Sequence, residues 1–298
     1  MTDASIPAPG PFHQALREFA FDGHGLQDLS ELDCRATPGF ETKKGKTQGK
    51  KAGRQRMQRD SARLSELQTL LFANAQAADS QRSLLLVIQG MDTSGKGGVI
   101  KHVVGTLDPQ GVRQVGFKKP TPEELEHDFL WRIRRHIPKH GEIGVFDRSH
   151  YEDVLVHRVD GLTAPSRLQR RYGSIRQFEQ DLVNNETRIL KVMLHLSREE
   201  QYRRLSARLD NPQKHWKFAP ADIDAREQWE QYLEAYRIAI EETDKADAPW
   251  FVIPADRKWY ARLAVQQLVM EALESMDLSW PTAAFDVEEQ RRRLEATR

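Results

Sequence analysis

Short apolar runs alternate along this chain with longer segments in which apolar residues are spaced for helices. A continuous apolar run of about five residues is typical of a parallel strand that is covered on both faces. The weakest of the runs is the second, in which polar residues alternate with apolar ones. The predicted strands are Leu84–Ile88, Val112–Phe117, Ile143–Phe146, Ile189–Leu196 and Trp250–Pro254.

Helix signals fill the segments between these runs. Leucines at helical spacing predict a helix over residues 61–78, with Ser61 as its cap. Thr121, Pro122 and Glu124 form a capping-box pattern, and Pro138 is expected to end that helix. Further helices are predicted from about residue 98, after a second capping box at residues 197–200, and over residues 258–276. The alternation predicts an α/β fold, a three-layer α/β/α sandwich around a parallel sheet.

The ends of the chain differ from this central pattern. Residues 1–60 have little periodicity and are rich in proline, glycine and charge, so they are predicted to form a basic, partly extended N-terminal arm. Residues 61–280 are expected to form one domain, with a helical lid at about 197–243. Residues 281–298 are expected to be a charged C-terminal tail.

Composition limits the class of protein. The 298 residues contain 45 basic and 44 acidic side chains, so the chain as a whole has no polyanion-binding signature. The single cysteine, Cys34, excludes an internal disulfide and a cysteine-based metal cluster, which fits a reducing compartment. No apolar run approaches the length of a membrane span, and the N-terminus lacks a signal-peptide pattern. We therefore expect a cytoplasmic protein without a membrane partner.

Charge is concentrated in one short segment. From Lys43 to Arg59 the chain has eight basic residues and no acidic one. Such a run is either a solvated linker or a segment that attracts a polyanion, and the sequence leaves both interpretations open.

The strongest motif follows the first strand. Gly90-Met91-Asp92-Thr93-Ser94-Gly95-Lys96-Gly97 matches the phosphate-binding pattern G-x-x-x-x-G-K between a predicted strand and a predicted helix. The glycines allow backbone N–H groups to point at phosphate oxygens, and the helix N-terminus adds positive potential. Lys96 supplies a charge to the phosphoryl group that moves. A chance glycine turn is the alternative, but the context favours a P-loop and a P-loop kinase-like fold.

This P-loop departs from the usual pattern after its lysine. Gly97 replaces the Ser or Thr that holds Mg²⁺ in most NTPases. Asp92, inside the loop, is the obvious substitute, because an acid in an anion-binding loop is costly unless a cation compensates it.

A second motif follows the strand at residues 143–146. Asp147 ends this strand as a Walker B carboxylate does, and it is expected to emerge beside the P-loop. It could hold Mg²⁺, and the neighbouring Arg148 could bind phosphate through its planar guanidinium. An ordinary capping Asp-Arg pair is the alternative.

The two motifs together resemble the polyphosphate kinase 2 family, which combines a P-loop of this kind with an Asp-Arg-Ser Walker B segment. The similarity continues through Asp108-Pro109-Gln110-Gly111-Val112, Phe117-Lys118-Lys119-Pro120 and Asp128-Phe129-Leu130-Trp131-Arg132, and covers most of residues 60–276. The resemblance implies Mg²⁺-dependent phosphoryl transfer, with Mn²⁺ as an alternative metal, between inorganic polyphosphate and AMP or ADP, or guanine nucleotides. It also implies a homo-oligomer. Ser149-His150-Tyr151-Glu152 resembles the branches that act on monophosphates, or on both mono- and diphosphates.

Roles follow from this reading. Because the acceptor phosphate is already ionised, catalysis must come from positioning and charge neutralisation. The predicted catalytic residues are Asp92, Lys96, Asp147 and Arg148, with Asp92 and Asp147 holding the metal. The predicted phosphate- and polyphosphate-binding residues are Gly90, Thr93, Ser94, Gly95, Gly97, Gly98, Lys101, Lys118, Arg203, Arg208, Lys214 and Lys217. The predicted nucleotide-binding residues, which recur every four positions on one helix face, are Glu124, Asp128 and Arg132.

Other interpretations remain open at this point. The face formed by Glu124, Asp128 and Arg132 could be solvated, and the basic lid could be an ordinary helix with aromatic core contacts. An ATP-dependent nucleotide or small-molecule kinase would have the same fold, although Gly97 weighs against it. A nucleic-acid-binding protein is opposed by the near-neutral charge and the intact P-loop, so no nucleic acid is expected as a partner.

Overall fold

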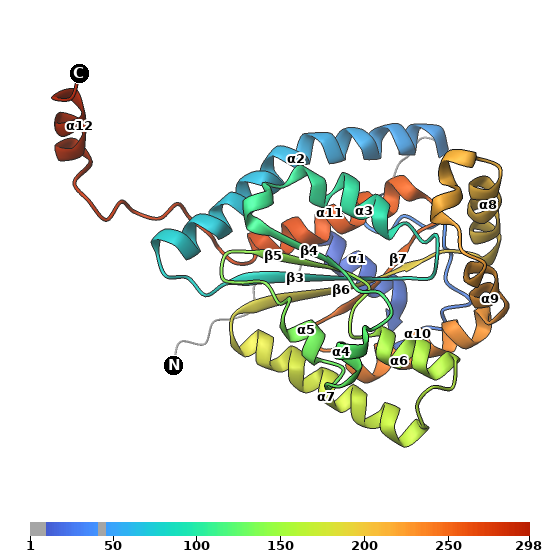
Figure 1. The fold of residues 1–298 in the computed structure, drawn as a ribbon. Helices are drawn as coiled ribbons and strands as arrows, with labels where there is room; N and C mark the ends of the chain where they lie inside the picture. Colours follow the sequence, from blue (N-terminus) through green and yellow to red (C-terminus); the bar gives the residue numbers. More distant parts are fainter. Residues whose placement is uncertain (1–9, 41–45) are drawn as a thin grey trace.

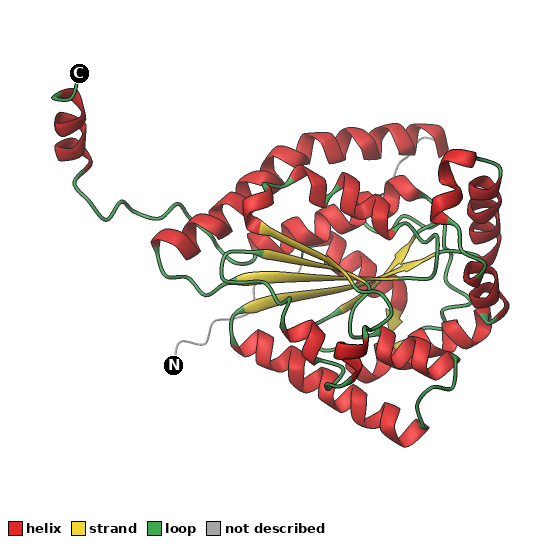
Figure 2. Ribbon diagram, in the orientation of Figure 1, coloured by secondary structure: helices red, strands yellow, loops and turns green. Residues whose placement is uncertain are grey.

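A five-stranded parallel sheet forms the centre of the computed structural model, which describes residues 10–40 and 46–298 (Figures 1 and 2). The strand order is β4-β5-β3-β6-β7, and every neighbouring pair is parallel. All five predicted strands are confirmed. Their bounds are β3 Ser83–Gln89, β4 Val112–Gly116, β5 Ile143–Asp147, β6 Thr187–His195 and β7 Trp250–Pro254.

The register of the sheet brings the two predicted motifs together. β3 lies between β5 and β6, and Ile88 is paired with Asp147. The turn after β3 is the P-loop, so the glycine-rich loop and the Walker B carboxylate emerge at the same carboxyl edge. In parallel sheets with helices on both faces, this edge is where ligands bind.

Helices cover both faces of the sheet, as the fold class predicted (Figure 1). One layer contains α2, α3 and α11, and the other contains α5, α6, α7 and α10. Two 3-10 turns and the short α4 connect these layers to the strands. The bounds are α2 Lys46–Ala77, α3 Lys96–His102, η1 Val104–Thr106, η2 Pro109–Gly111, α4 Pro122–Leu125, α5 Trp131–Arg134, α6 Glu152–Val159, α7 Pro165–Asn184, α10 Trp229–Thr243 and α11 Lys258–Glu274.

The N-terminal part is more helical than the predicted, partly extended arm. Residues 10–40 pack on the core through α1 (Pro11–Ala20) and a small hairpin of β1 (Phe21–Asp22) and β2 (Gly25–Leu26). The apolar side chains of α1 recur every four residues and are fully buried, a spacing that the proline and glycine content obscured; they are Phe12, Leu16 and Ala20. Residues 46–60 are also helical and form the first half of α2. Residues 1–9 and 41–45, with Lys43 and Lys44, lie outside the described residues.

Two predicted helix boundaries are wrong. Ser61 lies inside α2 and does not cap it; its hydroxyl donates to the carbonyl of Met57. The capping box at Thr121 is confirmed, but its helix ends at Leu125 and does not reach Pro138. At residues 197–200, Ser197 caps α8 (Arg198–Leu209), whereas Glu200 does not bond back and instead pairs with arginines.

The segment between β6 and β7 is helical, as predicted for the lid. It contains α8, η3 (Pro212–Lys217), α9 (Ala221–Glu227) and α10. After α11 the chain leaves the body of the molecule and ends in α12 (Val287–Glu295), which stands apart from the rest (Figure 1). Within residues 10–40 and 46–298, none of the helices combines the length and apolar character that crossing a bilayer requires.

Candidate active site

A cavity of about 730 Å³ opens at the carboxyl edge of the sheet. Its walls come from the P-loop and α3, from the ends of β4 and β5, from α8 and η3, and from α11. Nearly all the predicted catalytic and phosphate-binding residues line it. Those residues are Asp92, Thr93, Ser94, Gly95, Lys96, Gly97, Gly98, Lys101, Lys118, Asp147, Arg148, Arg203, Arg208, Lys214 and Lys217.

The P-loop backbone requires glycine at its first position. Gly90 has a φ of 144°, and a Cβ there would lie 2.8 Å from the carbonyl oxygen of Leu194. Gly95 has a φ of 119° directly before α3, so the loop turns sharply into the helix N-terminus. The buried hydroxyls of Thr93 and Ser94 have no hydrogen-bond partner within the described part of the chain. Since buried polar groups are normally paired, this observation supports a ligand-binding role for the loop.

Lys96 lies in the loop and bonds to its backbone. Its Nζ donates to the carbonyl oxygen of Gly90 at 2.5 Å. Burial lowers the pKa of Lys96, and the nearby Arg148 adds to the effect, while the carboxylates of Asp92 and Asp147 oppose it. Lys96 is thus a partly desolvated donor between two carboxylates and an arginine.

Arg148 connects the two motifs. Its Nη2 donates to Oδ1 of Asp92 at 3.1 Å, and its Nε lies 4.0 Å from Oε2 of Glu152. The residue has a φ of 64°, a left-handed conformation that is rare outside glycine, and its backbone N–H donates to Ile88. Burial acts to lower the pKa of Arg148, but Glu152, Asp92 and Asp147 outweigh it and raise this pKa. The guanidinium is therefore held charged at the mouth of the loop.

The two predicted metal ligands line the same cavity. Asp92 and Asp147 provide two carboxylates, and no larger His, Cys, Asp or Glu cluster suited to a metal occurs within residues 10–40 and 46–298. This set fits a Mg²⁺-type ion, which is commonly held by one or two carboxylates and completes its shell with water and substrate phosphates.

Several residues of the cavity escaped the sequence analysis. They are His102, Glu200, Lys258 and Arg262. Arg262 lies beside the end of the P-loop, since a Cβ on Gly98 would lie 3.1 Å from its Nη2. Arg203 and Arg204 are adjacent on the helix that Ser197 caps, and only the structure shows that they differ in role.

Arg204 joins the lid to the P-loop. Its guanidinium donates to the carbonyl oxygens of Thr93 at 2.9 Å and Ser94 at 3.0 Å. It also donates to Ala255 and Asp256, after β7, and its Nε donates to Oε1 of Glu200 at 2.7 Å. Arg204 therefore fixes the backbone of the loop against the lid helix and the neighbouring strand end.

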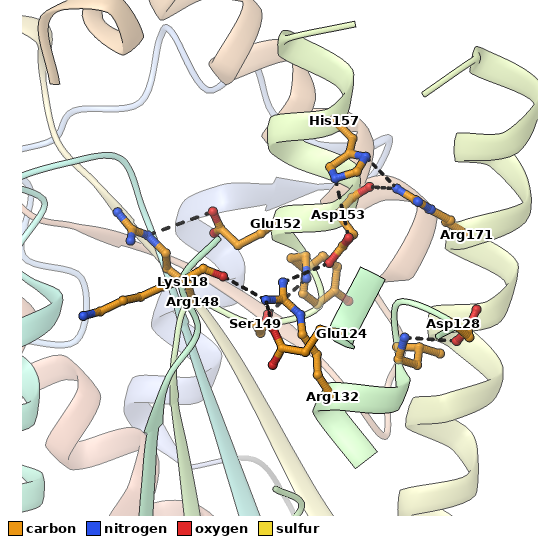
Figure 3. Close-up of polar contacts among 12 residues, drawn as sticks. Lys118, Glu124, Asp128, Arg132, Arg148, Ser149, Glu152, Asp153, His157 and Arg171 are labelled. Carbon is orange, nitrogen blue, oxygen red and sulfur yellow. Dashed lines mark hydrogen bonds and ion pairs between the residues drawn. The ribbon is translucent and has the colours of Figure 1, made fainter. Parts of the chain in front are cut away.

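The three predicted nucleotide-binding residues do not share one helix face, because α4 ends before Asp128 and Arg132 belongs to α5. None of them lines the main cavity, but Nη1 of Arg132 lies 3.7 Å from Oε2 of Glu124. Arg132 is buried, and it donates to the carbonyl oxygen of Lys118 at 2.8 Å and to Asp153 at 3.3 Å (Figure 3). Asp128 accepts from the backbone N–H of Leu130. These contacts hold the loop that carries Lys118, and nucleotide binding by the three residues stays a prediction.

A smaller cavity of about 100 Å³ lies on the other side of Asp92 and Arg148. It is shared by the P-loop, α6, α9 and α10, and its remaining lining residues are Gly90, Met91, Glu152, Leu155, Val156, Ala225, Tyr232 and Tyr236. The hydroxyl of Tyr236 accepts from the N–H of Gly90 at 3.0 Å. Burial raises the pKa of Glu152, although Arg148 and Lys96 oppose this effect.

A buried polar network holds the residues that follow the Walker B segment in the protein interior. Nζ of Lys191 donates to Oε2 of Glu179 at 2.6 Å, and the hydroxyl of Tyr151 donates to Oε1 of Glu179 at 2.8 Å. Burial acts to raise the pKa of Glu179, but Lys191 and His150 outweigh it and keep this pKa below its ordinary value. The network fixes His150 and Tyr151, directly after Ser149, within the protein interior.

Comparisons with known proteins agree with this geometry. The family described as Polyphosphate kinase 2 (PPK2) matches residues 48–281. A protein of Meiothermus ruber named "AMP/ADP-polyphosphate phosphotransferase" is 41% identical over 266 residues, covering 89% of this chain and 96% of that protein. A protein of Rhodopseudomonas palustris named "ADP-polyphosphate phosphotransferase" is 45% identical over 235 residues, covering 74% of this chain and 78% of the relative.

The fold also matches a solved structure. The crystal structure titled polyphosphate kinase 2 from Arthrobacter aurescens TC1 superposes with a TM-score of 0.90 at 46% sequence identity. The match covers 97% of this chain and 99% of the other. The similarity thus extends over the N-terminal residues as well as the sheet.

Proposed function

This chain belongs to the polyphosphate kinase 2 family, and on that basis we propose that it transfers phosphoryl groups between inorganic polyphosphate and nucleotides. It is a kinase-type transferase whose acceptor is the phosphate group of a nucleoside mono- or diphosphate. The names of its relatives support this activity, since they act on polyphosphate together with AMP, ADP or GDP.

The observation that carries the proposal is the charge of the main cavity. Its lining includes eleven Lys and Arg side chains against three carboxylates, and Phe117 is the one Phe, Tyr or Trp among its lining residues. An ATP donor would need an apolar surface for its base, whereas a chain of phosphates needs only cations along its path. The cavity therefore favours polyphosphate over ATP as the molecule that lies along it.

The two cavities favour an in-line reaction between them. Asp92 and Arg148 line both, so a phosphoryl group could pass from a donor in the large cavity to an acceptor in the small one. An oxygen of the acceptor phosphate forms a bond to the terminal phosphorus of the polymer, while the bridging P–O bond breaks and shortens the polymer by one unit. No general base is required, because the attacking oxygen is already ionised.

The residues of this chain supply the positioning and the charge. Lys96 and the N–H groups of the P-loop bind the oxygens around the transferred group, and Arg148 steadies it between the two cavities. Asp92 and Asp147 would hold a divalent metal, which we propose to be Mg²⁺ or Mn²⁺. When bound, such an ion neutralises the charge that accumulates on the phosphate oxygens.

We propose that the acceptor approaches the reacting group through the small cavity, which at about 100 Å³ holds only part of a nucleotide. The aromatic and apolar walls of this cavity, with Tyr232 and Leu155, can contact a nucleoside, while Arg148 reaches the phosphate end. We propose AMP and ADP as acceptors, since the sequence Ser149-His150-Tyr151-Glu152 resembles the branches that use monophosphates or both.

We propose three further properties of the protein. The single cysteine supports a cytoplasmic location, and the charge pattern supports the absence of a nucleic-acid partner. A homo-oligomer is supported by the C-terminal segment, which extends away from the body with exposed apolar side chains at Trp280, Phe285 and Leu294. Light scattering on the whole chain and on a chain ending at Leu278 would test the oligomer.

The activity is tested by separating donors and acceptors. The purified protein is incubated with Mg²⁺ and either polyphosphate or ATP as donor, and with AMP or ADP as acceptor. We expect chromatography to show ADP and ATP formed from AMP, and ATP formed from ADP, with polyphosphate as the sole donor. Phosphorylation of AMP by ATP alone, with polyphosphate unused, would establish the alternative of an ATP-dependent kinase.

A further inference from the structure

The basic lining of the main cavity continues onto the surface of α2. Lys101, His102 and Arg262 line the cavity, and Arg262 lies on α11, the helix against which α2 packs. Burial lowers the pKa of His102, and the charges of Arg262, Lys101 and Arg54 lower it further. Arg54 likewise lowers the pKa of Arg262, after the larger effect of burial. Arg54 follows Gly53, which packs against Trp259 of α11, and Arg262 lies three residues after Trp259 on that helix; Arg54 is therefore close to the cavity rim although it does not line the cavity.

Packing fixes this part of α2 in place. A Cβ on Gly53 would lie only 2.4 Å from two ring carbons of Trp259 on α11, so glycine allows the two helices to approach closely at this point. The ring of Trp259 also meets that of Phe40 edge to face, with centroids 5.6 Å apart. Arg56 donates to Gln267 of α11 at 2.7 Å. The position of Arg54 thus follows from packing along the helix.

Arg54 is the inner end of a patch of unneutralised charge. Lys50 and Lys51 precede it by four and three residues, so the three side chains share one face of α2, and all three are exposed. Within the part of the chain that the structure describes, none of them forms an ion pair with a carboxylate. Farther along the same helix, Arg56 and Arg59 both pair with Asp60.

This contrast points to a ligand. Like charges at such spacing destabilise a helix, and the neighbouring turn shows that an acid can be placed to relieve them. A patch of cations that continues an anion-binding cavity fits a polyanion too long to be contained in that cavity. A solvated face without a ligand would not be expected to continue the basic lining of the cavity.

We propose that Lys50, Lys51 and Arg54 form an outer subsite that binds polyphosphate units beyond those held in the main cavity. The proposal rests on the proposed function, since it takes polyphosphate as the donor. The subsite makes long chains better donors than short ones, because a short chain fills the cavity without reaching α2. It does not touch the reacting phosphate, so it affects binding of the polymer and leaves turnover unchanged.

The test compares two charge-matched variants. The first is K50Q/K51Q/R54Q, and the control is R167Q/R170Q/K245Q, which removes the same charge from exposed positions on α7 and beyond α10. Steady-state kinetics with AMP are measured for tripolyphosphate and for long-chain polyphosphate. Binding of end-labelled long-chain polyphosphate without nucleotide is measured by fluorescence anisotropy, and thermal unfolding verifies that each variant is folded.

We expect the α2 variant to raise the KM and the Kd for long chains by about tenfold, the combined effect of about three exposed charge pairs. Its kcat, and its KM for tripolyphosphate, should stay at the wild-type values, and the control should match wild type throughout. Unchanged long-chain affinity overturns the proposal, as does an equal loss for short and long chains. Equally tight binding of a single-stranded oligonucleotide would assign the patch to nucleic acid instead. Failure of the wild-type protein to use any polyphosphate would refute the proposed function itself.

Discussion

Replacing Arg204 by methionine, with Arg203 as the control, should distinguish an arginine that holds the site together from one that binds substrate. The Arg204 side chain is 6% exposed and donates five hydrogen bonds, four of them to backbone carbonyls at Thr93, Ser94, Ala255 and Asp256. Methionine keeps an unbranched apolar side chain in place of the arginine stem, but it lacks the guanidinium and satisfies none of these acceptors. The variant therefore removes the polar contacts while it keeps the packing of the stem.

The expected loss of stability is about 3–5 kcal/mol, the range for removing one partner of a buried, hydrogen-bonded charge pair. A simple sum over five charged hydrogen bonds would exceed this range, but such bonds are not additive and the freed carbonyls regain some water. Because two of these carbonyls belong to the P-loop, the loop should also lose its fixed geometry. We therefore expect kcat to fall together with the free energy of unfolding.

Arg203 provides the matched control, since it is adjacent and pairs with the same Glu200. Its side chain is 61% exposed, so R203M should cost less than about 1 kcal/mol of stability, and it should raise the KM for polyphosphate instead. Urea unfolding followed by circular dichroism gives the stability, and steady-state kinetics give KM and kcat. Equal stability of R203M and R204M would refute the assignment of Arg204 as the residue that joins lid and loop.

Three further predictions concern the site and its support. D92N, K96A and D147N should each lower kcat at least about a hundredfold while the melting temperature changes little, and a variant with near-normal kinetics would lose its catalytic role. Burial lowers the pKa of His195 from its ordinary value of 6.5, so its contribution to stability is fully present above pH 6.5 and is lost as the pH falls towards the lowered pKa. Unfolding curves from pH 8 to 5 should accordingly show that H195N loses less stability on acidification than the wild type does. Equal losses of stability would show that His195 does not contribute to this pH dependence. G53A should cost about 1–3 kcal/mol, because the added methyl group overlaps Trp259, and an unchanged denaturation midpoint would contradict the close approach of α2 and α11.

The strands and the P-loop could be predicted because their signals are local. The run at residues 83–89 is buried along its whole length, and a glycine turn follows directly. Asp147 could be placed beside the loop because parallel strands end at one edge. In contrast, the helix after Thr121 was predicted too long, since the cap fixes where a helix begins and tertiary contacts decide where it ends. Arg132 shows such a tertiary contact, because it is buried against Asp153, which lies 21 residues farther along the chain.

The roles of individual arginines could not be predicted, for a related reason. Arg203 and Arg204 have the same chemistry and adjacent positions, and only the direction in which each points distinguishes them. Glu200 was expected to complete a capping box, but two arginines on its own helix compete for it. The burial of α1 depends on contacts with β7 and α11, more than two hundred residues away, and Glu271 accepts from the backbone of Phe12. No pattern within one segment contains that information.

The same contacts limit which part of the predicted lid can move. The first helix, α8, is joined to the P-loop by Arg204 and to the end of β7 by Ser197, which donates to Asp256 through its N–H and its hydroxyl. The last helix, α10, holds the loop through Tyr236. Between them, η3 is exposed along its length, and Arg208 connects it to α8 by donating to the carbonyl oxygen of Lys217. The helix α9 is joined to α8 as well, since Arg226 donates to the carbonyl oxygen of Arg198 and Arg208 donates to Asp222. We therefore expect closure over a substrate to involve η3, which would bring Lys214 and Lys217 towards the phosphates, while the three helices stay with the core.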